Sequence, residues 1–235
     1  MSGWMQVWKY TQTYADWKIR LEQTGSYTPE ALETREYISH LSEEEFRALL
    51  SRQLNAKSRQ QPHYWKDQKY NNPSQPVVGL TWFETRAYCA WLSEVTGQLY
   101  RLPTEPEWEA AARGSDGRIF SWGNDFDPSK ANTIEGRVLR PFPVGAYAAT
   151  SLGPFQAEDQ TGNVWEWTSS LVQPYPYTET SEDPEVAEER VVRGGSFSLT
   201  RDDERCATRL RLAPDNFLTT LGFRVVSPGF LSTDC

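Results

Sequence analysis

Apolar residues recur at helical spacing on an otherwise polar background early in the chain. Ser42 followed by Glu45 forms a capping box, because the glutamate can reach back to the amide of the cap. Behind it runs one apolar stripe on a charged helix, made of Phe46, Leu49, Leu50 and Leu54. Such a stripe needs a cover, either a partner or this protein's own core, and we expect its own core.

The same signals predict two further helices. Thr81 and Glu84 form a second capping box, and the helix it opens ends at Gly97 with one face made of Trp82, Thr85, Tyr88, Cys89 and Leu92. A third helix opens at Thr104, with proline in its first turn, and carries Trp108, Ala111 and Ala112. We expect both helices to bury their tryptophan against a sheet.

Beyond Gly114 the pattern changes to short elements separated by glycine and proline. Residues 190–193 and 222–226 alternate as strands do, and residues 173–189 form a proline- and acid-rich stretch typical of a surface loop. By contrast, the pattern of residues 1–60 predicts a helical and polar part. We therefore expect a helical N-terminal part over residues 1–60, packed on a main domain of residues 61–235.

Composition argues against several classes of protein, among them nucleic-acid-binding, membrane-spanning and disulfide-rich proteins. The 235 residues carry a net charge of -8 with a pI near 5.0, which argues against a nucleic-acid partner. No apolar run is long enough to span a membrane, and no secretory signal is recognisable. The 3 cysteines cannot build a disulfide framework, and the histidines, His40 and His63, have no metal-ligating neighbours at a useful spacing. We expect a cytoplasmic protein.

Several ordered blocks carry a resemblance. They read Pro-Val-Val-Gly-Leu-Thr-Trp at 76–82, Arg-Leu-Pro-Thr-Glu-Pro-Glu-Trp-Glu at 101–109, Trp-Gly-Asn at 122–124, Gly-Asn-Val-Trp-Glu-Trp-Thr at 162–168, Val-Arg-Gly-Gly-Ser-Phe at 192–197 and Leu-Gly-Phe-Arg at 221–224. Together they resemble the formylglycine-generating enzyme and sulfatase-modifying-factor family. The resemblance implies an α+β fold, a variant of the C-type lectin fold with little regular secondary structure and two main helices packed on short antiparallel sheets.

The resemblance also raises a difference in chemistry. Enzymes of this family carry two copper-binding cysteines between the Arg-Gly-Gly-Ser block and a Cys-Ala-x-Arg block, which here begins at Cys206. Residues 196–205 contain no cysteine; Leu199 stands near the first position, and Asp202 or Asp203 near the second. Because a thiolate is the ligand that a soft metal needs, we expect no copper and no oxidase activity. The cluster Asp202-Asp203-Glu204 could form an acid/base site, but its flanking arginines favour a solvated charge cluster.

A calcium site is implied instead. Residues 159–166 resemble the family's calcium loop, in which Asp159 and Glu166 would give carboxylate oxygens and Gly162 and Val164 backbone carbonyls, the hard ligands that Ca²⁺ prefers. The alternative is a loop held by hydrogen bonds without metal. A second family site would begin at Asn132 and Thr133, with Glu135 as the nearest acid.

One branch of the family consists of variable proteins of diversity-generating retroelements, in which the segment between the Gly-Gly-Ser and Gly-Phe-Arg blocks is rewritten by mutagenesis at adenines. Asparagine codons changed in this way do not reach Lys, Gln, Met, Trp or Glu, and residues 194–224 contain none of the first four and a single glutamate. We therefore expect a non-catalytic protein that binds a protein ligand. The expected surface comprises Phe197, Ser198, Leu199, Thr200, Asp202, Thr208, Leu210, Leu212, Phe217, Leu218 and Thr219, although half of these could belong to the core. The alternative is a related enzyme or a pseudo-enzyme accessory.

Two sets of side chains are expected to be structural. Arg101 and Arg224 should pair with carboxylates such as Glu105 or Glu109. Cys89 and Cys206 match family cysteines whose disulfide partners are replaced here by Val225 and Ala112 respectively, so both thiols should be reduced and buried.

Overall fold

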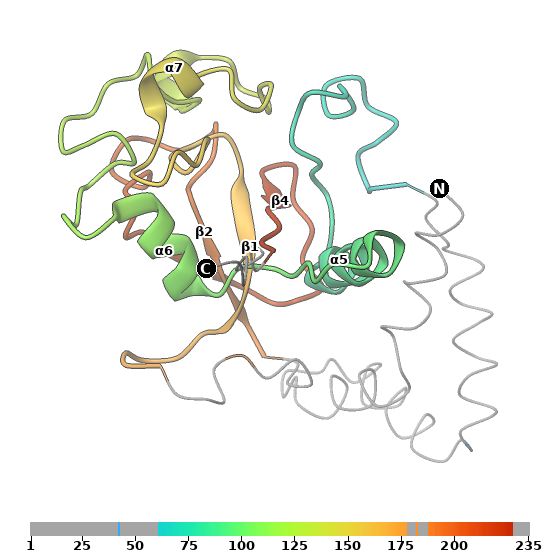
Figure 1. The fold of residues 1–235 in the computed structure, drawn as a ribbon. Coiled ribbons are helices and arrows are strands. Elements are labelled where there is room, and N and C mark those ends of the chain that lie inside the picture. The colour runs from blue at the N-terminus through green and yellow to red at the C-terminus, as the bar shows by residue number, and fades with distance from the viewer. Residues whose placement is uncertain (1–41, 43–60, 178–181, 183–187, 228–235) are drawn as a thin grey trace, which may run out of the picture.

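A computed structural model describes residue 42, residues 61–177, residue 182 and residues 188–227 (Figure 1). The predicted N-terminal helices and Cys235 lie outside these residues, so the division at residue 60 stays a prediction. In chain order the elements are α5 (Trp82–Thr96), α6 (Glu105–Arg113), a 3₁₀ turn (Ile134–Gly136), α7 (Ala148–Ser151), β1 (Trp165–Leu171), β2 (Arg190–Arg193), β3 (Arg209–Leu212) and β4 (Leu221–Phe223).

The two main helices begin where their capping residues predict. Thr81 accepts a hydrogen bond from the amide of Glu84, whose side chain reaches back to the cap, and α5 ends at Gly97 in the left-handed conformation. Thr104 and Glu107 form the same reciprocal pair at the start of α6. These local signals decide both helix starts, and both predicted helices are confirmed.

The four strands form one mixed sheet in the order β3-β2-β1-β4. β2 runs antiparallel to both β1 and β3, whereas β4 runs parallel to β1. The α+β fold is confirmed, but the sheet is not purely antiparallel, because the chain crosses from β3 to the opposite edge before it forms β4. The strand expected over residues 222–226 is also shorter: regular pairing ends at Phe223, and Val226 forms only an isolated bridge with Arg101.

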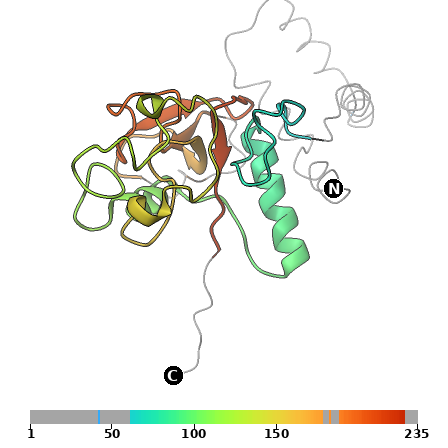
Figure 2. The same cartoon turned by 90° about the horizontal axis from the view of Figure 1, so that it is seen from above.

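Figures 1 and 2 place α6 on the β2 side of the strands and α5 on the β4 side. The tryptophans Trp82 and Trp108 are each only 1% exposed, as expected. The indole of Trp82 donates to the carbonyl of Thr168 at 2.9 Å, so its one polar atom is satisfied in the core. It belongs to an apolar cluster with Phe83, Cys89, Leu102, Trp165, Trp167, Val192 and Leu221.

Beside α6 the interior also contains buried charged side chains. Arg193 and Glu105 are fully buried and form an ion pair, and Arg193 also donates to Glu109 at 2.8 Å. Arg209 binds the same Glu105 at 2.7 Å. A buried charge is tolerated when it is paired and hydrogen-bonded in this way.

Arginine pairing therefore differs in detail from the prediction. Arg101 pairs with Glu107 at 2.6 Å, and Arg224 pairs with Glu166 at 2.5 Å. Their role in ion pairs is as expected, but Glu105 and Glu109 instead pair with Arg193.

None of the helices in the described residues is long and apolar enough to cross a membrane.

Candidate ligand-binding surface and cation cavity

The segment after β2 starts at two glycines that no other residue could replace without strain. Gly194 and Gly195 have φ values of 102° and 77°. A Cβ at Gly194 would lie 3.2 Å from the Trp108 ring, and one at Gly195 would overlap the Glu204 carboxylate. This pair therefore combines unusual backbone angles with a close approach of neighbouring side chains, which only glycine allows.

Backbone hydrogen bonds hold this segment on the domain. The amide of Ser196 donates to Glu204 Oε1 at 3.0 Å, and that of Cys206 donates to the carbonyl of Ile119 at 2.8 Å. Farther along, the amide of Trp82 donates to the carbonyl of Pro214 at 2.9 Å, and that of Gly79 to Leu218 at 3.1 Å. The segment is thus a path fixed at several points rather than a free loop.

The expected ligand-binding residues divide into three groups. Phe197 is buried, and Leu199 and Leu212 pack against the apolar cluster. Partly exposed positions are Thr208, Phe217 and Thr219, and exposed positions are Ser198, Thr200, Asp202, Leu210 and Leu218. The amide of Phe197 donates to the carbonyl of Asn163 at 3.0 Å, which holds this part of the backbone on the domain.

Five exposed charged residues of the segment are absent from the expected set: Arg201, Asp203, Arg205, Arg211 and Asp215. Their charge alone marks them as surface residues, so this signal was available in the sequence. With the exposed positions above, they give the segment a mixed polar and apolar outer face.

Glu204 departs from the expected solvated cluster. Asp202 and Asp203 are exposed, but Glu204 is fully buried. Burial raises the pKa of its carboxyl well above the usual 4.5, although the amide of Ser196 opposes the rise. Within the described part of the chain, Glu204 thus supports the glycine turn rather than a shared acid/base site with its two neighbours.

The cysteine chemistry also follows from position. Cys89 and Cys206 are buried and free. Burial raises the pKa of Cys89 to about 12 and that of Cys206 to about 11, so neither is a thiolate at neutral pH. Cys206 packs with Ala112 and Cys89 lies in the cluster that Val225 packs against, as the resemblance implies.

Carboxylates gather in a second place. A cavity of about 370 Å³ is lined by Asp159, Val164 and Glu166, three of the four expected calcium-binding residues, together with Glu158 and Arg224. Gly162 does not line it. Asp159, Gly162 and Asn163 all have positive φ, which makes the loop tight.

Charge in this cavity is only partly balanced. Arg224 neutralises Glu166, whereas Asp159 accepts a hydrogen bond from the Gly145 amide at 2.9 Å. Burial, and then the nearby Glu166 carboxylate, raises the pKa of Asp159. A hard cation would relieve this crowding of carboxylates, and oxygen ligands suit such an ion. Within the described residues, however, no three His, Cys, Asp or Glu side chains are already gathered as a metal site.

The expected second site is less complete. Asn132 and Thr133 are buried, and the Asn132 side chain donates to the carbonyl of Arg140 at 2.9 Å while its own Oδ1 has no hydrogen-bond partner. Glu135, the nearest acid, instead accepts from the Arg201 amide at 3.0 Å. Asn132 therefore ties two loops together, and the site lacks a carboxylate committed to it.

Comparisons with known proteins place this geometry in a family. The chain is 38% identical over 166 residues to the inactive C-alpha-formylglycine-generating enzyme 2 of Bos taurus, covering 65% of this chain and 50% of that protein. It is 34% identical over 183 residues to the formylglycine-generating enzyme of Streptomyces coelicolor, covering 68% and 55%. The chain thus spans about half the length of these curated relatives.

Solved structures support the same fold. PvdO from Pseudomonas aeruginosa aligns with a TM-score of 0.55 and 26% identity, over 66% of this chain and 63% of that one. The Treponema denticola variable protein 1 aligns with a TM-score of 0.59 and 20% identity, over 73% and 78%. The model of the sulfatase-modifying factor enzyme 1-like domain matches residues 5–228, and the protein belongs to this family.

Proposed function

We propose that this protein is a non-catalytic member of its family that binds a protein ligand through the outer face of residues 198–218. The observation that carries the proposal is the contrast between a fixed backbone and exposed side chains. Hydrogen bonds at Ser196, Cys206, Pro214 and Leu218 hold the path of the chain. Side chains between these points, such as Thr200, face solvent. Loops on a rigid scaffold accept sequence change and are common binding surfaces.

The chemistry of the segment supports a binding role over oxidation. Residues 196–205 offer no thiol, and Leu199, near the first catalytic position of the enzymes, packs on the apolar cluster. Leu210 is 37% exposed and lies between Arg209 and Arg211 in the chain, and Leu218 is 36% exposed. Apolar groups with nearby arginine are typical of the central part of protein interfaces.

The fold shared with the Treponema variable protein suits this role. That protein is named a variable protein. In this chain, the segment proposed to be diversified lies between β2 and β4. The proposed ligand-binding function of this chain is therefore that of a display protein, in which one backbone carries different surfaces.

A pseudo-enzyme accessory is the second candidate. It is favoured by similarity to the bovine protein named as an inactive formylglycine-generating enzyme. In that case the domain would recognise an enzyme or its substrate rather than a variable ligand.

A paired experiment tests the binding proposal. The chain is compared with a variant carrying Ser198→Ala, Thr200→Ala, Leu210→Ser and Leu218→Ser in affinity capture followed by mass spectrometry. We expect a ligand that is retained by the wild type and lost by the variant at an unchanged melting temperature. A copper-loaded wild-type sample that converts the cysteine of a sulfatase-type peptide would overturn the non-catalytic assignment.

We also propose that the cavity at Asp159 binds Ca²⁺. Support comes from the half-buried Asp159 carboxylate, which lines one cavity together with Glu158, Glu166 and Val164. The ion would supply structural charge balance and no reaction step. Its test is the chelation experiment described in the Discussion.

A further inference from the structure

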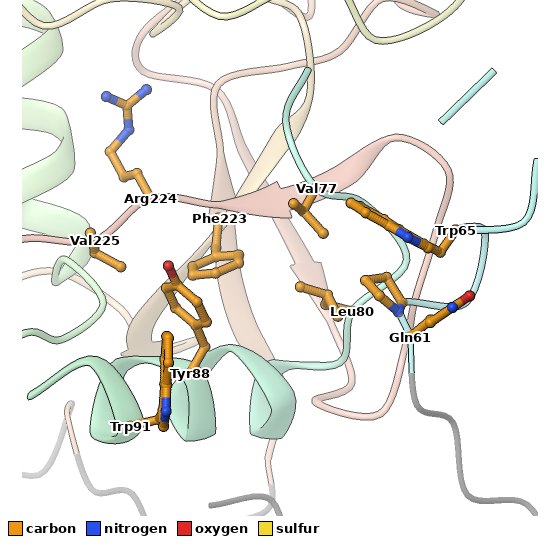
Figure 3. A pocket seen from close by; sticks show the side chains of 10 residues that line it. Gln61, Trp65, Val77, Leu80, Tyr88, Trp91, Phe223, Arg224 and Val225 are labelled. Atoms are coloured by element: carbon orange, nitrogen blue, oxygen red, sulfur yellow. The ribbon is translucent and has the colours of Figure 1, made fainter. Parts of the chain in front are cut away.

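The two edges of the sheet differ in how the chain covers them. Along β4, the amide of Gly79 donates to the carbonyl of Leu221 at 3.2 Å. A Cβ on Gly222 would lie 2.7 Å from the carbonyl oxygen of Val77, and Figure 3 shows Val77 beside β4. The chain from Val77 to Gly79 therefore covers the outer edge of β4.

The opposite edge is β3 (Arg209–Leu212), which pairs with β2 on one side. In an antiparallel pair every second residue directs its amide and carbonyl away from the neighbouring strand. In the part of the chain that the structure describes, no backbone hydrogen bond beyond those to β2 involves residues 209–212. The outer side of β3 therefore presents donors and acceptors to which a further strand can bind.

The side chains of β3 form one apolar and one charged face, because successive residues of a strand point to opposite sides of the sheet. Leu212 packs against the apolar cluster, and Leu210, on the same face, is exposed. Arg209 and Arg211 lie on the other face. A strand that continues this sheet would match the edge if its own residues alternated between apolar and acidic.

Arg211 is the charge that this edge offers to a partner. Its side chain is 72% exposed, and its ion pair with Glu189 spans 3.9 Å between two exposed groups, so replacing Glu189 by another carboxylate costs little. Arg209, by contrast, is held at 2.7 Å by the buried Glu105. An acidic side chain on an added strand would therefore meet Arg211.

The same arginines argue against a second copy of this chain at the edge. Two copies related by a twofold axis would pair their β3 strands antiparallel. With matching faces, Arg209 or Arg211 would then stand opposite an arginine of the other copy. Like charges directly opposite each other destabilise a sheet, so the edge suits a strand of different sequence.

We propose that the protein ligand adds an extended segment to the outer edge of β3, with acidic side chains on the face of Arg211 and apolar side chains on the face of Leu210. This inference rests on the ligand-binding role proposed above and names the part of the ligand that is recognised. The edge is continuous with the proposed surface, to which Leu210 belongs. Backbone hydrogen bonds supply affinity in this mode, and the alternating side chains supply specificity.

A strand peptide tests the edge in the purified full chain. The probe is a capped peptide of roughly eight alternating glutamate and valine residues, the length of an ordinary strand, added at up to about 1 mM. We expect NMR shifts at the amides of residues 209–212 and slower hydrogen exchange at those that face outward. Shifts confined to other residues, or no shifts at all, would overturn the inference.

Two N-methylated forms of the peptide test whether its backbone is recognised. Methyl groups on the glutamate amides and on the valine amides lie on opposite edges of an extended strand. We expect one form to lose binding, because its methyl groups face β3, and the other to keep it. Equal binding by the two forms would contradict strand addition.

A charge reversal tests the face of Arg211. Arg211→Glu should weaken binding of the glutamate peptide by about threefold to tenfold and favour the matched lysine–valine peptide. Arg140→Glu, at an exposed arginine outside the surface, should leave both affinities unchanged. Equal affinities in wild type and Arg211→Glu, at equal melting temperatures, would remove Arg211 from the site.

The peptide and the ligand capture fail separately. A captured ligand without peptide binding at β3 overturns this inference alone, whereas peptide binding with no captured ligand overturns the proposed function and leaves the edge as a strand-binding site. A dimer that forms without peptide and protects the amides of residues 209–212 would assign the edge to a second copy and overturn the inference.

Discussion

The interior beside α6 and the surface after β2 are neighbours in the fold, but they differ in how their polar side chains are held. In the interior, Glu105 and Arg193 are fully buried, and each is fixed by more than one polar partner. On the surface, Thr200 and Asp202 face solvent while their backbone is held. A change in the first region disturbs several bonds at once, whereas a change in the second alters only what the protein presents.

This contrast explains how one domain can be rigid and variable. Buried ion pairs fix the geometry because removing one partner leaves an uncompensated charge. The partners of Thr200 and Asp202, which are Asp203 and Arg201, are themselves exposed, so losing them leaves no buried charge. The following predictions measure the difference between the regions, beginning with the largest effect.

Glu105→Ala should lower the free energy of unfolding by about 3–5 kcal/mol, because Arg193 would stay buried without its carboxylate. Urea denaturation measures the loss. Glu107→Ala, in the same turn of α6, is the control: its pair with Arg101 is more than 40% exposed, so only a cap and a surface pair are lost, about 1–2 kcal/mol. Equal losses would remove the distinction between buried and exposed carboxylates.

Chelation should lower the melting temperature if Ca²⁺ binds at Asp159. An ion present at 100 times its dissociation constant stabilises the native state by about 2.7 kcal/mol. Melting curves in EDTA and after Ca²⁺ is added back give the measurement. Asp159→Asn should abolish the response and Asp127→Asn, in an exposed turn, should keep it. An unchanged curve in EDTA would count against the site.

Gly195→Ala should cost about 2–4 kcal/mol, more than Gly97→Ala. Both glycines have positive φ, a strain of about 1–2 kcal/mol for other residues. Only Gly195 would also push its Cβ into Glu204, since nothing lies within 4 Å of a Cβ at Gly97. Thermal denaturation of the two variants isolates the clash. Adding Glu204→Ala to the Gly195 variant should recover part of the loss; no recovery would place the strain elsewhere.

Cys89→Ala should cost about 1 kcal/mol or somewhat more, because a small buried group is removed. In the native protein Cys89 and Cys206 should react slowly with a thiol reagent, and Cys235 quickly. Mass spectrometry of the labelled peptides tests this order. Rapid modification of Cys206, or a disulfide between it and Cys89, would contradict the burial of both thiols.

Thr200→Ala and Asp202→Asn should each change the free energy of unfolding by no more than about 0.5 kcal/mol, as for most surface substitutions. Both side chains are exposed. Urea denaturation of these variants and of the Glu105 variant in one series allows the losses of unfolding free energy in the two regions to be compared directly. A loss above 1 kcal/mol at Thr200 would show that this part of the segment is structural.

The sequence predicted those features that depend on near neighbours. Capping boxes at Thr81 and Thr104 act over a few residues, and both helices start as expected. The burial of Glu204 was missed, since it depends on the return of the chain to Gly195. β1 gave no alternating pattern because nearly all of it is buried.

The candidate-site residues also divide into those whose exposure depends on their own polarity and those whose burial depends on distant contacts. Exposure of Ser198 and Asp202 could be expected from polarity, but burial of Phe197 depends on a contact with the distant Asn163. Trp65, Trp91 and Phe223 line one groove although they come from three separate stretches of the chain. A pattern of neighbouring residues cannot predict that these side chains lie close together.

The order of the strands has a consequence for how such a domain can change in length. β3 and β4 lie at opposite edges, each held by its own neighbour in the sheet. Extra residues inserted in the turn at 200–203 would therefore lengthen a closed loop without shifting the register of either strand. The entropy of closing a loop grows slowly, by about 0.6 kcal/mol for each doubling of its length. Insertions and deletions, as well as substitutions, are thus open routes by which descendants of this chain could reshape the face they present.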